Sequence, residues 1–228
     1  MKSRVRIGYQ ADFPPFMFQQ DGPAGLVIDA LASAVVDLGE AGAEIAWMAL
    51  ALDHQQQALI DGEVDLLAGL GVTPDRARDV VFGEALVRTG GALFRRQGAS
   101  SLERIVTPRS GPLHEPTGAA FPECELLDAT DYKHALDQVR AGRADAAALN
   151  IHVGAVLAER DYPGLVDLPN EPFAIVELAP AYAPDHDIEL RRLIDNRSGR
   201  HRGDHAELEG PEARSARCPS SLSIINNP

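Results

Sequence analysis

The sequence predicts an α/β protein built from two similar lobes, and a phrase that occurs twice is the main reason. Residues 58–69 read ALIDGEVDLLAG, and residues 138–150 read QVRAGRADAAALN. Each copy contains the end of a helix, a Gly suited to the left-handed position beyond that helix, one Asp, and a short apolar strand. The apolar runs are unbroken, which is typical of strands covered on both faces. Because open α/β sheets bind ligands beyond the carboxyl ends of their strands, we expect a ligand held between two such edges.

In the first part of the chain the apolar spacing alternates between that of a strand and that of a helix. Arg4–Tyr9 is predicted as a strand, and the Pro pair after Phe13 ends it. From Leu26 to Leu38 apolar residues recur at steps of three and four, which predicts a helix. The remaining elements expected here are a strand at Glu44–Met48, a helix capped by Asp53 and ending at Ile60, a strand at Val64–Ala68, and a helix that begins at Thr73-Pro-Asp-Arg76.

The pattern starts again after an extended crossing segment at Val87–Arg95. A second extended segment, Phe173–Leu178, is placed to cross back. Between and after them we expect strands at Arg104–Thr107, Glu125–Leu127, Asp145–Leu149 and Leu165–Leu168, and helices at Asp131–Ala141, His152–Arg160 and Ile188–Ile194.

The last part of the chain, residues 196–228, has a different composition. It has no aromatic residue and almost no apolar periodicity before Leu222. We expect a disordered or poorly packed tail, produced either by divergence or by a shifted reading frame.

Composition excludes several classes of function. A net charge of −13 argues against binding to nucleic acid or to anionic membrane surfaces, and no apolar run approaches a membrane span. Cys124 and Cys218 are the only cysteines, and neither has metal-type neighbours. His201 and His205 are spaced i, i+4, but Gly203 between them weakens any helix. We therefore predict neither a metal site nor a cofactor.

Several linked motifs resemble those of the solute-binding protein family 3, the polar amino-acid type of type II periplasmic binding proteins. The resemblance spans residues 4–194 and depends on the common order and spacing of its motifs. These are RIGY followed by FPPF at 13–16, GLVID at 25–29, GEVDLLAGLGVTPDR at 62–76, Phe82, GRAD at 142–145, and EPFAI at 171–175.

The resemblance implies two α/β lobes joined by two hinge strands, with a ligand cleft between the lobes. Lobe 1 would comprise residues 1–90 and 177–195, and lobe 2 residues 91–176. It also implies a monomeric extracytoplasmic or periplasmic protein that passes a small carboxylate ligand to the membrane permease of an ABC importer. The chain shows no apolar signal segment. Either a leader has been removed, or this is a cytoplasmic protein or a domain of a longer one.

Arg76 is the strongest candidate for ligand binding. A guanidinium at a helix start beside a strand end can hold a carboxylate with two parallel hydrogen bonds, and the helix start adds positive potential. The alternative is a structural ion pair with Asp75 or Asp79. Gly69 and Gly71 would let the main chain approach a ligand, and the Thr73 hydroxyl would donate unless capping uses it.

In relatives the residue that matches Arg76 binds the α-carboxylate of an amino acid, and an aromatic at the position of Phe13 stacks on the ligand. Phe13 is equally compatible with a place in the core, and Phe16 is expected to be a core residue. Arg109 and Ser110 lie on the lobe 2 loop where relatives contact the carboxylate. Arg109 is either a second clamp, which would favour a dicarboxylate, or a solvated loop residue.

Two residues depart from the family pattern. Asn150 occupies the position where amino-acid binders usually have the Asp that accepts the ligand's ammonium, and Gln10 occupies a position that is often Asp in binders of cationic amino acids. Neutral amides do not neutralise an ammonium, and burying an unpaired charge is costly. We therefore expect a carboxylate ligand whose amine is absent, or is met elsewhere, with Glu171 as a candidate.

Two other functions remain open on the same fold. One is an enzyme similar to cyclohexadienyl dehydratases, in which Glu171 or Glu115 would serve as an acid if buried and neutral. The sequence shows no nucleophile elbow, phosphate loop or metal triad, so we expect a protein without catalytic residues. The other is the sensor module of a signalling receptor.

Overall fold

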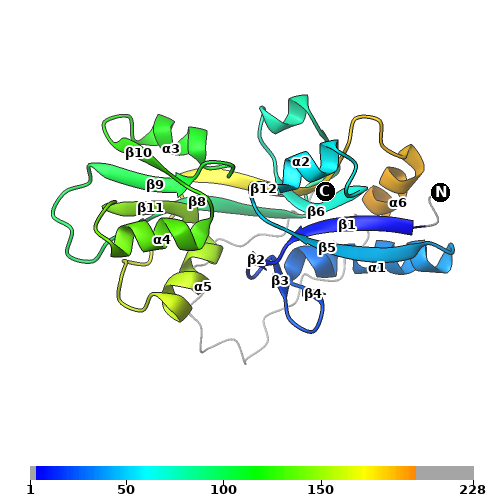
Figure 1. The fold of residues 1–228 in the computed structure, drawn as a ribbon, viewed down its shortest axis with the longest axis horizontal. Coiled ribbons are helices and arrows are strands. Elements are labelled where there is room, and N and C mark those ends of the chain that lie inside the picture. The colour runs from blue at the N-terminus through cyan, green and yellow to red at the C-terminus, as the bar shows by residue number, and fades with distance from the viewer. Residues whose placement is uncertain (1–3, 199–228) are drawn as a thin grey trace. The chain divides into compact units, whose positions relative to one another are not determined.

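The computed structural model describes residues 4–198 and divides them into two compact units. Unit 1 contains residues 4–88 and 177–198, and unit 2 contains residues 89–176. The chain passes from unit 1 to unit 2 within strand β8 (Val87–Arg95) and returns within strand β12 (Ala174–Tyr182) (Figure 1). No helix in residues 4–198 combines the length and the apolar character needed to cross a membrane.

The sheet of unit 1 is mainly parallel, in the order β12-β6-β1-β5. At its centre β1 (Arg4–Gln10) pairs in parallel with β5 (Glu44–Leu50) on one side and with β6 (Leu66–Gly71) on the other. Strand β12 runs antiparallel to β6, and β7 (Val81–Phe82) pairs with β12. Every residue of β6 is buried, as the unbroken apolar run predicts.

Helices α1 (Leu26–Glu40), α2 (Gln55–Ile60) and α6 (Ile188–Ser198) flank these strands. The apolar stripe predicted between Leu26 and Leu38 is the buried face of α1, which also packs against α6. A small antiparallel sheet of β2 (Asp12–Phe13), β3 (Met17–Gln19) and β4 (Pro23–Ala24) precedes α1.

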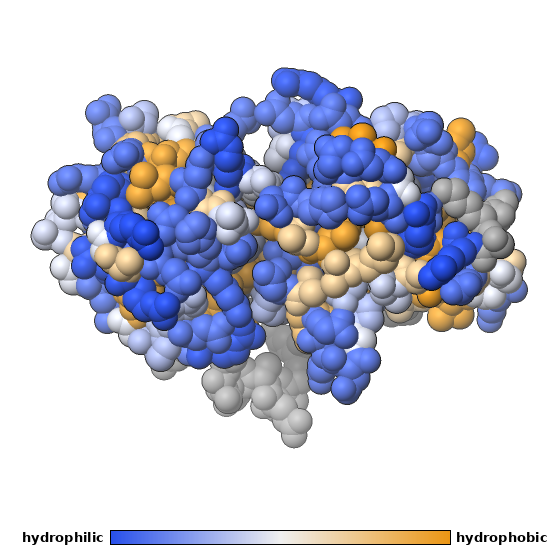
Figure 2. All heavy atoms as spheres, viewed as in Figure 1, coloured by the Kyte–Doolittle hydropathy of each residue, from blue (hydrophilic) through white to orange (hydrophobic). Residues whose placement is uncertain are grey.

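The sheet of unit 2 is also mainly parallel, with the strand order β10-β9-β11-β8. Strands β9 (Arg104–Pro108), β10 (Glu125–Ala129) and β11 (Ala146–Asn150) are parallel, and β8 runs antiparallel to β11. Helices α3 (His114–Ala120), α4 (Tyr132–Arg140) and α5 (Ile151–Asp161) complete the unit. Figure 2 shows polar and charged residues over much of the visible surface of each unit.

The repeated phrase has the same conformation in both units. Gly62 and Gly142 adopt φ values of 70° and 69°, the left-handed geometry predicted beyond a helix. The Asp that follows each glycine is buried and binds the amino-terminal end of a neighbouring parallel strand. Asp65 accepts from the backbone N–H and guanidinium of Arg6, and Asp145 accepts from the same two groups of Arg104.

Several predicted elements are wrong in extent. The helix expected from Thr73 is a single 3-10 turn, η1 (Arg76–Arg78), because the chain enters β7 directly after it. Leu165–Leu168 is not a strand: only Val166 forms a bridge, with Arg96, in a segment bounded by Gly164 and Pro169.

Three helices of the structure also differ from what the sequence predicted. Asp53 does not cap α2, which starts at Gln55 without a side-chain cap. Helix α3 was not expected. Helix α6 continues beyond Ile194 to Ser198, supported by an i, i+4 ion pair of Arg191 with Asp195. The rest of the predicted tail, including His201 and His205, lies outside the described residues.

Candidate functional site

The predicted ligand-binding residues of unit 1 gather at the carboxyl ends of its parallel strands. Gln10 is the last residue of β1, and Gly71 is the last residue of β6. Thr73 and Arg76 follow β6 within one turn. The carboxyl ends of parallel strands are where open α/β sheets bind ligands, so this edge is the candidate site of unit 1.

Arg76 is a buried cation at this edge. Its guanidinium Nη1 donates to the carbonyl of Gly71 at 2.7 Å, and its backbone N–H donates to Thr73 Oγ1 at 3.2 Å. The residue is 8% exposed. The capping role of Thr73 uses its oxygen as an acceptor, and a hydroxyl can still donate while it accepts.

The two acids that the sequence offered as partners for Arg76 contact other side chains. Asp75 forms an ion pair with Arg78 at 2.9 Å between its Oδ1 and Nη1 of the arginine. Asp79 accepts from Gln56 Nε2 at 3.0 Å. The latter bond ties the turn of Arg76 to α2.

Gly69 has a packing role. A Cβ on Gly69 would lie 2.9 Å from Cγ1 of Val27 in α1, well inside normal contact distance. Gly71 is buried at the strand end, and its carbonyl positions the Arg76 guanidinium. The structure therefore gives Gly69 a reason to be glycine that does not depend on a ligand.

Gln10 is the centre of a chain of side-chain hydrogen bonds. Gln55 Nε2 donates to Gln10 Oε1 at 3.1 Å, and Gln10 Nε2 donates to Asp12 Oδ1 at 3.0 Å. Gln10 and Gln55 are each 3% exposed, whereas Asp12 is exposed. Gln55 was missed from the sequence, because no local pattern shows that the first residue of α2 contacts the end of β1.

Phe13 and Phe16 pack on each other with ring centroids 5.3 Å apart. Phe16 is completely buried, in agreement with the core role expected for it. Phe13 is 5% exposed, so it also belongs to the packing of unit 1. Stacking of Phe13 on a ligand stays a prediction.

Unit 2 places Arg109, Ser110 and Asn150 at the carboxyl edge of its own sheet. Arg109 and Ser110 follow the last residue of β9, and both are exposed. Nη1 of Arg109 donates to Asp128 Oδ2 at 2.6 Å. This hydrogen bond lowers the pKa of Asp128, and a hydrogen bond from His114 adds to the effect. Arg109 thus has the geometry of a solvated loop arginine with an acidic partner.

Asn150 ends β11 and caps α5. Its Oδ1 accepts from the backbone N–H groups of His152 and Val153 at 3.1 and 3.3 Å, and its Nδ2 donates to Thr89 Oγ1 at 3.2 Å. Asn150 and Thr89 are 2% and 3% exposed. Burial lowers the pKa of the neighbouring His152, which keeps its ring neutral at physiological pH. An Asn two residues before a predicted helix was a signal that could have revealed this cap.

Glu171 lies in the loop before β12 and is exposed. Glu115, in the first turn of α3, is also exposed. The enzyme hypothesis required one of these acids to be buried, and both are exposed.

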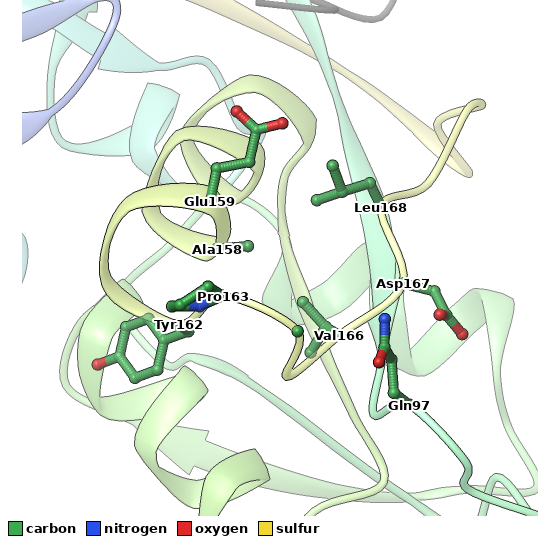
Figure 3. Close-up of a pocket in the computed structure, with 9 residues that line it drawn as sticks. Gln97, Ala158, Glu159, Tyr162, Pro163, Val166, Asp167 and Leu168 are labelled. Atoms are coloured by element: carbon green, nitrogen blue, oxygen red, sulfur yellow. The ribbon is translucent and has the colours of Figure 1, made fainter.

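Two cavities in the described part of the chain lie away from the predicted residues. One, of about 510 Å³ in unit 2, is bounded by the end of α5 and the segment 163–168 (Figure 3). The other, of about 490 Å³ in unit 1, lies beside the Arg6–Asp65 ion pair at the opposite ends of the parallel strands. Neither cavity is lined by any residue predicted to bind the ligand.

Comparison with known proteins agrees with this architecture. A family model described as bacterial extracellular solute-binding proteins, family 3, matches residues 5–197. No curated protein sequence matches.

Solved structures with the same fold include an ancestral arginine-binding protein bound to glutamine, with 20% identity, a TM-score of 0.76, and coverage of 90% of this chain and 94% of that one. The arginine-bound form of truncated ArgBP from T. maritima has 17% identity, a TM-score of 0.73, and coverage of 87% and 96%. A histidine kinase sensor domain similar to periplasmic binding proteins has 20% identity, a TM-score of 0.76, and coverage of 87% and 90%. The predicted type II periplasmic binding protein-like fold is confirmed.

Proposed function

The chain belongs to the bacterial extracellular solute-binding proteins, family 3, and on that premise we propose that it captures a small carboxylate-bearing solute for an ABC importer. Proteins of this family that share its fold bind amino acids, among them arginine and glutamine. The proposal places the protein outside the cytoplasm, as a monomer that passes its solute to a membrane permease.

The observation that carries the proposal is the buried guanidinium of Arg76 at the carboxyl edge of unit 1. Burying a cation is costly unless hydrogen-bonding partners compensate it. The carbonyl of Gly71 accepts from this guanidinium, and Thr73 Oγ1 accepts from the backbone N–H of Arg76 in the turn that carries it. A positioned guanidinium matches the geometry of a carboxylate with two parallel hydrogen bonds. Micromolar affinity requires about 8 kcal/mol, which such a pair can supply together with apolar contacts.

The other predicted residues take supporting roles in the proposal. Thr73 and the backbone of Gly69 and Gly71 would complete the carboxylate site, and Phe13 would contact the apolar part of the solute. On the second lobe, Ser110 and Asn150 would contact the solute, with Arg109 and Glu171 as exposed side chains near the entrance. We place lobe 1 at residues 1–90 and 177–195, lobe 2 at residues 91–176, and the hinges in β8 and β12, so that closure about these strands buries the solute.

The test replaces Arg76 by Met, which keeps much of the side-chain volume and removes the charge. Calorimetric titration with amino acids and with the corresponding oxo and hydroxy acids measures the effect. Loss of one bidentate charged contact is expected to weaken binding about 100-fold. Arg78→Met is the matched control, because Arg78 is two residues away, 75% exposed and paired with Asp75, and it should bind as the wild type does. Unchanged affinity in Arg76→Met would contradict the proposal.

Two alternatives remain on the same fold. One structural neighbour is AncCDT-1, an ancestral amino-acid-binding protein described as a precursor of cyclohexadienyl dehydratase, with 22% identity and a TM-score of 0.70. The exposure of Glu115 and Glu171 argues against the dehydratase function, and a spectroscopic assay with prephenate separates turnover from binding. The likeness to a kinase sensor domain is compatible with a signalling role, which would use the same Arg76 site.

A further inference from the structure

We infer that Gln56 and Asp79 position Arg76 for the solute, because their hydrogen bond connects the turn that carries Arg76 to helix α2. This inference rests on the proposed function and adds two positioning residues to the same site. Neither of them needs to contact the solute. All of the contacts that support the inference lie within unit 1.

The main chain of Arg76 is hydrogen-bonded on both sides of the residue. Its N–H donates to Thr73 Oγ1 at 3.2 Å, and its carbonyl accepts from the backbone N–H groups of Asp79 and Val80, both at 3.0 Å. Guanidinium Nη1 donates to the carbonyl of Gly71 at 2.7 Å. Because the Arg76 carbonyl is bonded to Asp79, a displacement of Asp79 also displaces the residue that carries the guanidinium.

The turn is short and depends on its neighbours for its position. It is a single 3-10 turn, whose hydrogen-bond geometry is poorer than that of an α-helix. Directly after it, Val80 is 3% exposed and belongs to the same core cluster as Leu59 of α2. Apolar contact of this kind is non-directional, so it fixes the depth of the turn and not its orientation. Gln56 Nε2 donates to Asp79 Oδ2 at 3.0 Å, and this directional bond adds the second constraint.

Helix α2 is suited to position the turn because it is itself bonded to the end of β1. Gln55 is 3% exposed, and its Nε2 donates to the Oε1 of Gln10, the last residue of β1, at 3.1 Å. The helix has six residues and no side-chain cap, so it depends on such tertiary contacts. The next glutamine, Gln56, therefore reaches Asp79 from a helix that is fixed to the carboxyl edge of the sheet.

The chemistry of the pair allows a test that keeps side-chain length and net charge unchanged. A carboxylate only accepts, so the Gln56 atom 3.0 Å from Asp79 must be the amide nitrogen. Gln56→Glu alone sets two carboxylates against each other and removes the hydrogen bond. Gln56→Glu combined with Asp79→Asn, the reversed pair, restores the bond with donor and acceptor exchanged.

Gln57→Glu is the matched control. Gln57 is in the same helix, and its Nε2 donates to Asp61 Oδ1 at 2.8 Å, four residues further along the chain. The substitution opposes two carboxylates in the same way, but Asp61 lies at the end of α2 and not on the turn of Arg76. An effect that Gln56→Glu owes only to a weakened α2 should therefore also appear in Gln57→Glu.

Amide hydrogen exchange in the solute-free protein, followed by NMR, tests the position of the turn directly. The N–H groups of Asp79 and Val80 report on it, because both donate to the Arg76 carbonyl. Asp79 is exposed, so water competes for its carboxylate. We therefore expect Gln56→Glu to speed the exchange of both groups by about 3- to 10-fold. The reversed pair should return the rates to wild-type values, and Gln57→Glu should leave them unchanged.

Calorimetry with L-arginine, L-glutamine, L-glutamate and 2-oxoglutarate tests the effect on binding. The probe that the wild type binds most tightly should bind about 3- to 10-fold more weakly to Gln56→Glu. It should bind with wild-type affinity to the reversed pair and to Gln57→Glu. Gln56→Ala removes the donor without adding a charge and should weaken binding in the same direction, so it replaces Gln56→Glu if that variant does not fold. If none of the four probes binds, the exchange rates decide the inference by themselves.

Three results would overturn the inference: unchanged exchange rates in Gln56→Glu, no recovery in the reversed pair, or an equal effect of Gln57→Glu. Arg76→Met distinguishes this failure from that of the proposed function. If Arg76→Met weakens binding about 100-fold while Gln56→Glu binds as the wild type does, the proposed function stands and only the positioning role is wrong. If Arg76→Met binds as the wild type does, the proposed function itself is wrong.

Discussion

Removing the carboxylate of Asp145 should destabilise the protein more than removing an exposed acid does. The side chain of Asp145 is 7% exposed and connects the start of β11 to the start of β9. It accepts from the backbone N–H groups of Glu103 and Arg104 at 3.1 and 2.9 Å, and from Arg104 Nη2 at 3.1 Å. The substitution Asp145→Ala removes all three acceptor contacts at once.

The magnitude follows from the groups that lose their partner. Each backbone N–H left without an acceptor costs about 1–3 kcal/mol, and breaking one side of a buried ion pair costs about 3–5 kcal/mol. The Arg104 side chain is 38% exposed, so water can solvate it once the partner is gone. The expected loss in the free energy of unfolding is therefore near the lower end of the range for a broken buried ion pair, at about 3 kcal/mol.

Urea unfolding followed by far-UV circular dichroism measures this loss. A change of that size should lower the midpoint by about 1–2 M. Glu44→Ala is the matched control, because its ion pair with Arg4 is 3.6 Å long and both side chains are more than half exposed. Its effect should stay below about 1 kcal/mol. The reasoning fails if Asp145→Ala moves the midpoint no further than Glu44→Ala.

Three further predictions concern packing and pH. Gly69→Ala places a Cβ 2.9 Å from Val27 and should lower the free energy of unfolding by about 1–3 kcal/mol. Thermal melts should show that adding Val27→Ala recovers part of this loss. If the effects of the two substitutions simply add, the contact is contradicted. Burial would raise the pKa of Asp145, but its hydrogen bonds outweigh that effect, and the hydrogen bond from a neighbouring arginine lowers the pKa of Asp128. Because both pKa values are depressed in the folded state, the two carboxylates stabilise the protein at neutral pH, and this stability is lost as pH falls below about 4. Melting temperatures measured from pH 7 to pH 3 test this. In Asp145→Asn the melting temperature should change less over the same range. Burial raises the pKa of Tyr162 to about 12. Absorbance at alkaline pH should therefore show a phenol that ionises at higher pH than an ordinary tyrosine, and Tyr162→Phe should remove this signal. The stability that this group contributes is lost as pH rises through its folded-state pKa.

The repeated phrase shows how much local sequence can predict. The glycine stops and the apolar runs are local signals, and the structure confirms them in both units. The reason for the repeated Asp is not local. Asp65 binds Arg6, which is 59 residues away, and Asp145 binds Arg104, which is 41 residues away. The sequence shows that the Asp recurs in both copies, but only the folded structure shows which arginine it binds.

In the candidate site too, features with local partners were predictable from the sequence and features with distant partners were not. Arg76 was recognisable because its environment is sequential: Gly71 and Thr73 contact it from positions five and three residues earlier. Asn150 was recognised as a departure from the family pattern, but its role as the cap of α5 was missed, although capping is a local rule. Gln55 could not be found, because its bond to Gln10 joins a helix start to a strand end 45 residues apart.

By itself, the sequence determined the class of fold, the lengths of most elements and the cation at the edge of the first sheet. These depend on periodicity, on turn residues and on neighbours within one or two turns. Only the tertiary structure decided the direction in which each buried amide points, because that direction is set by distant groups that can only donate or only accept.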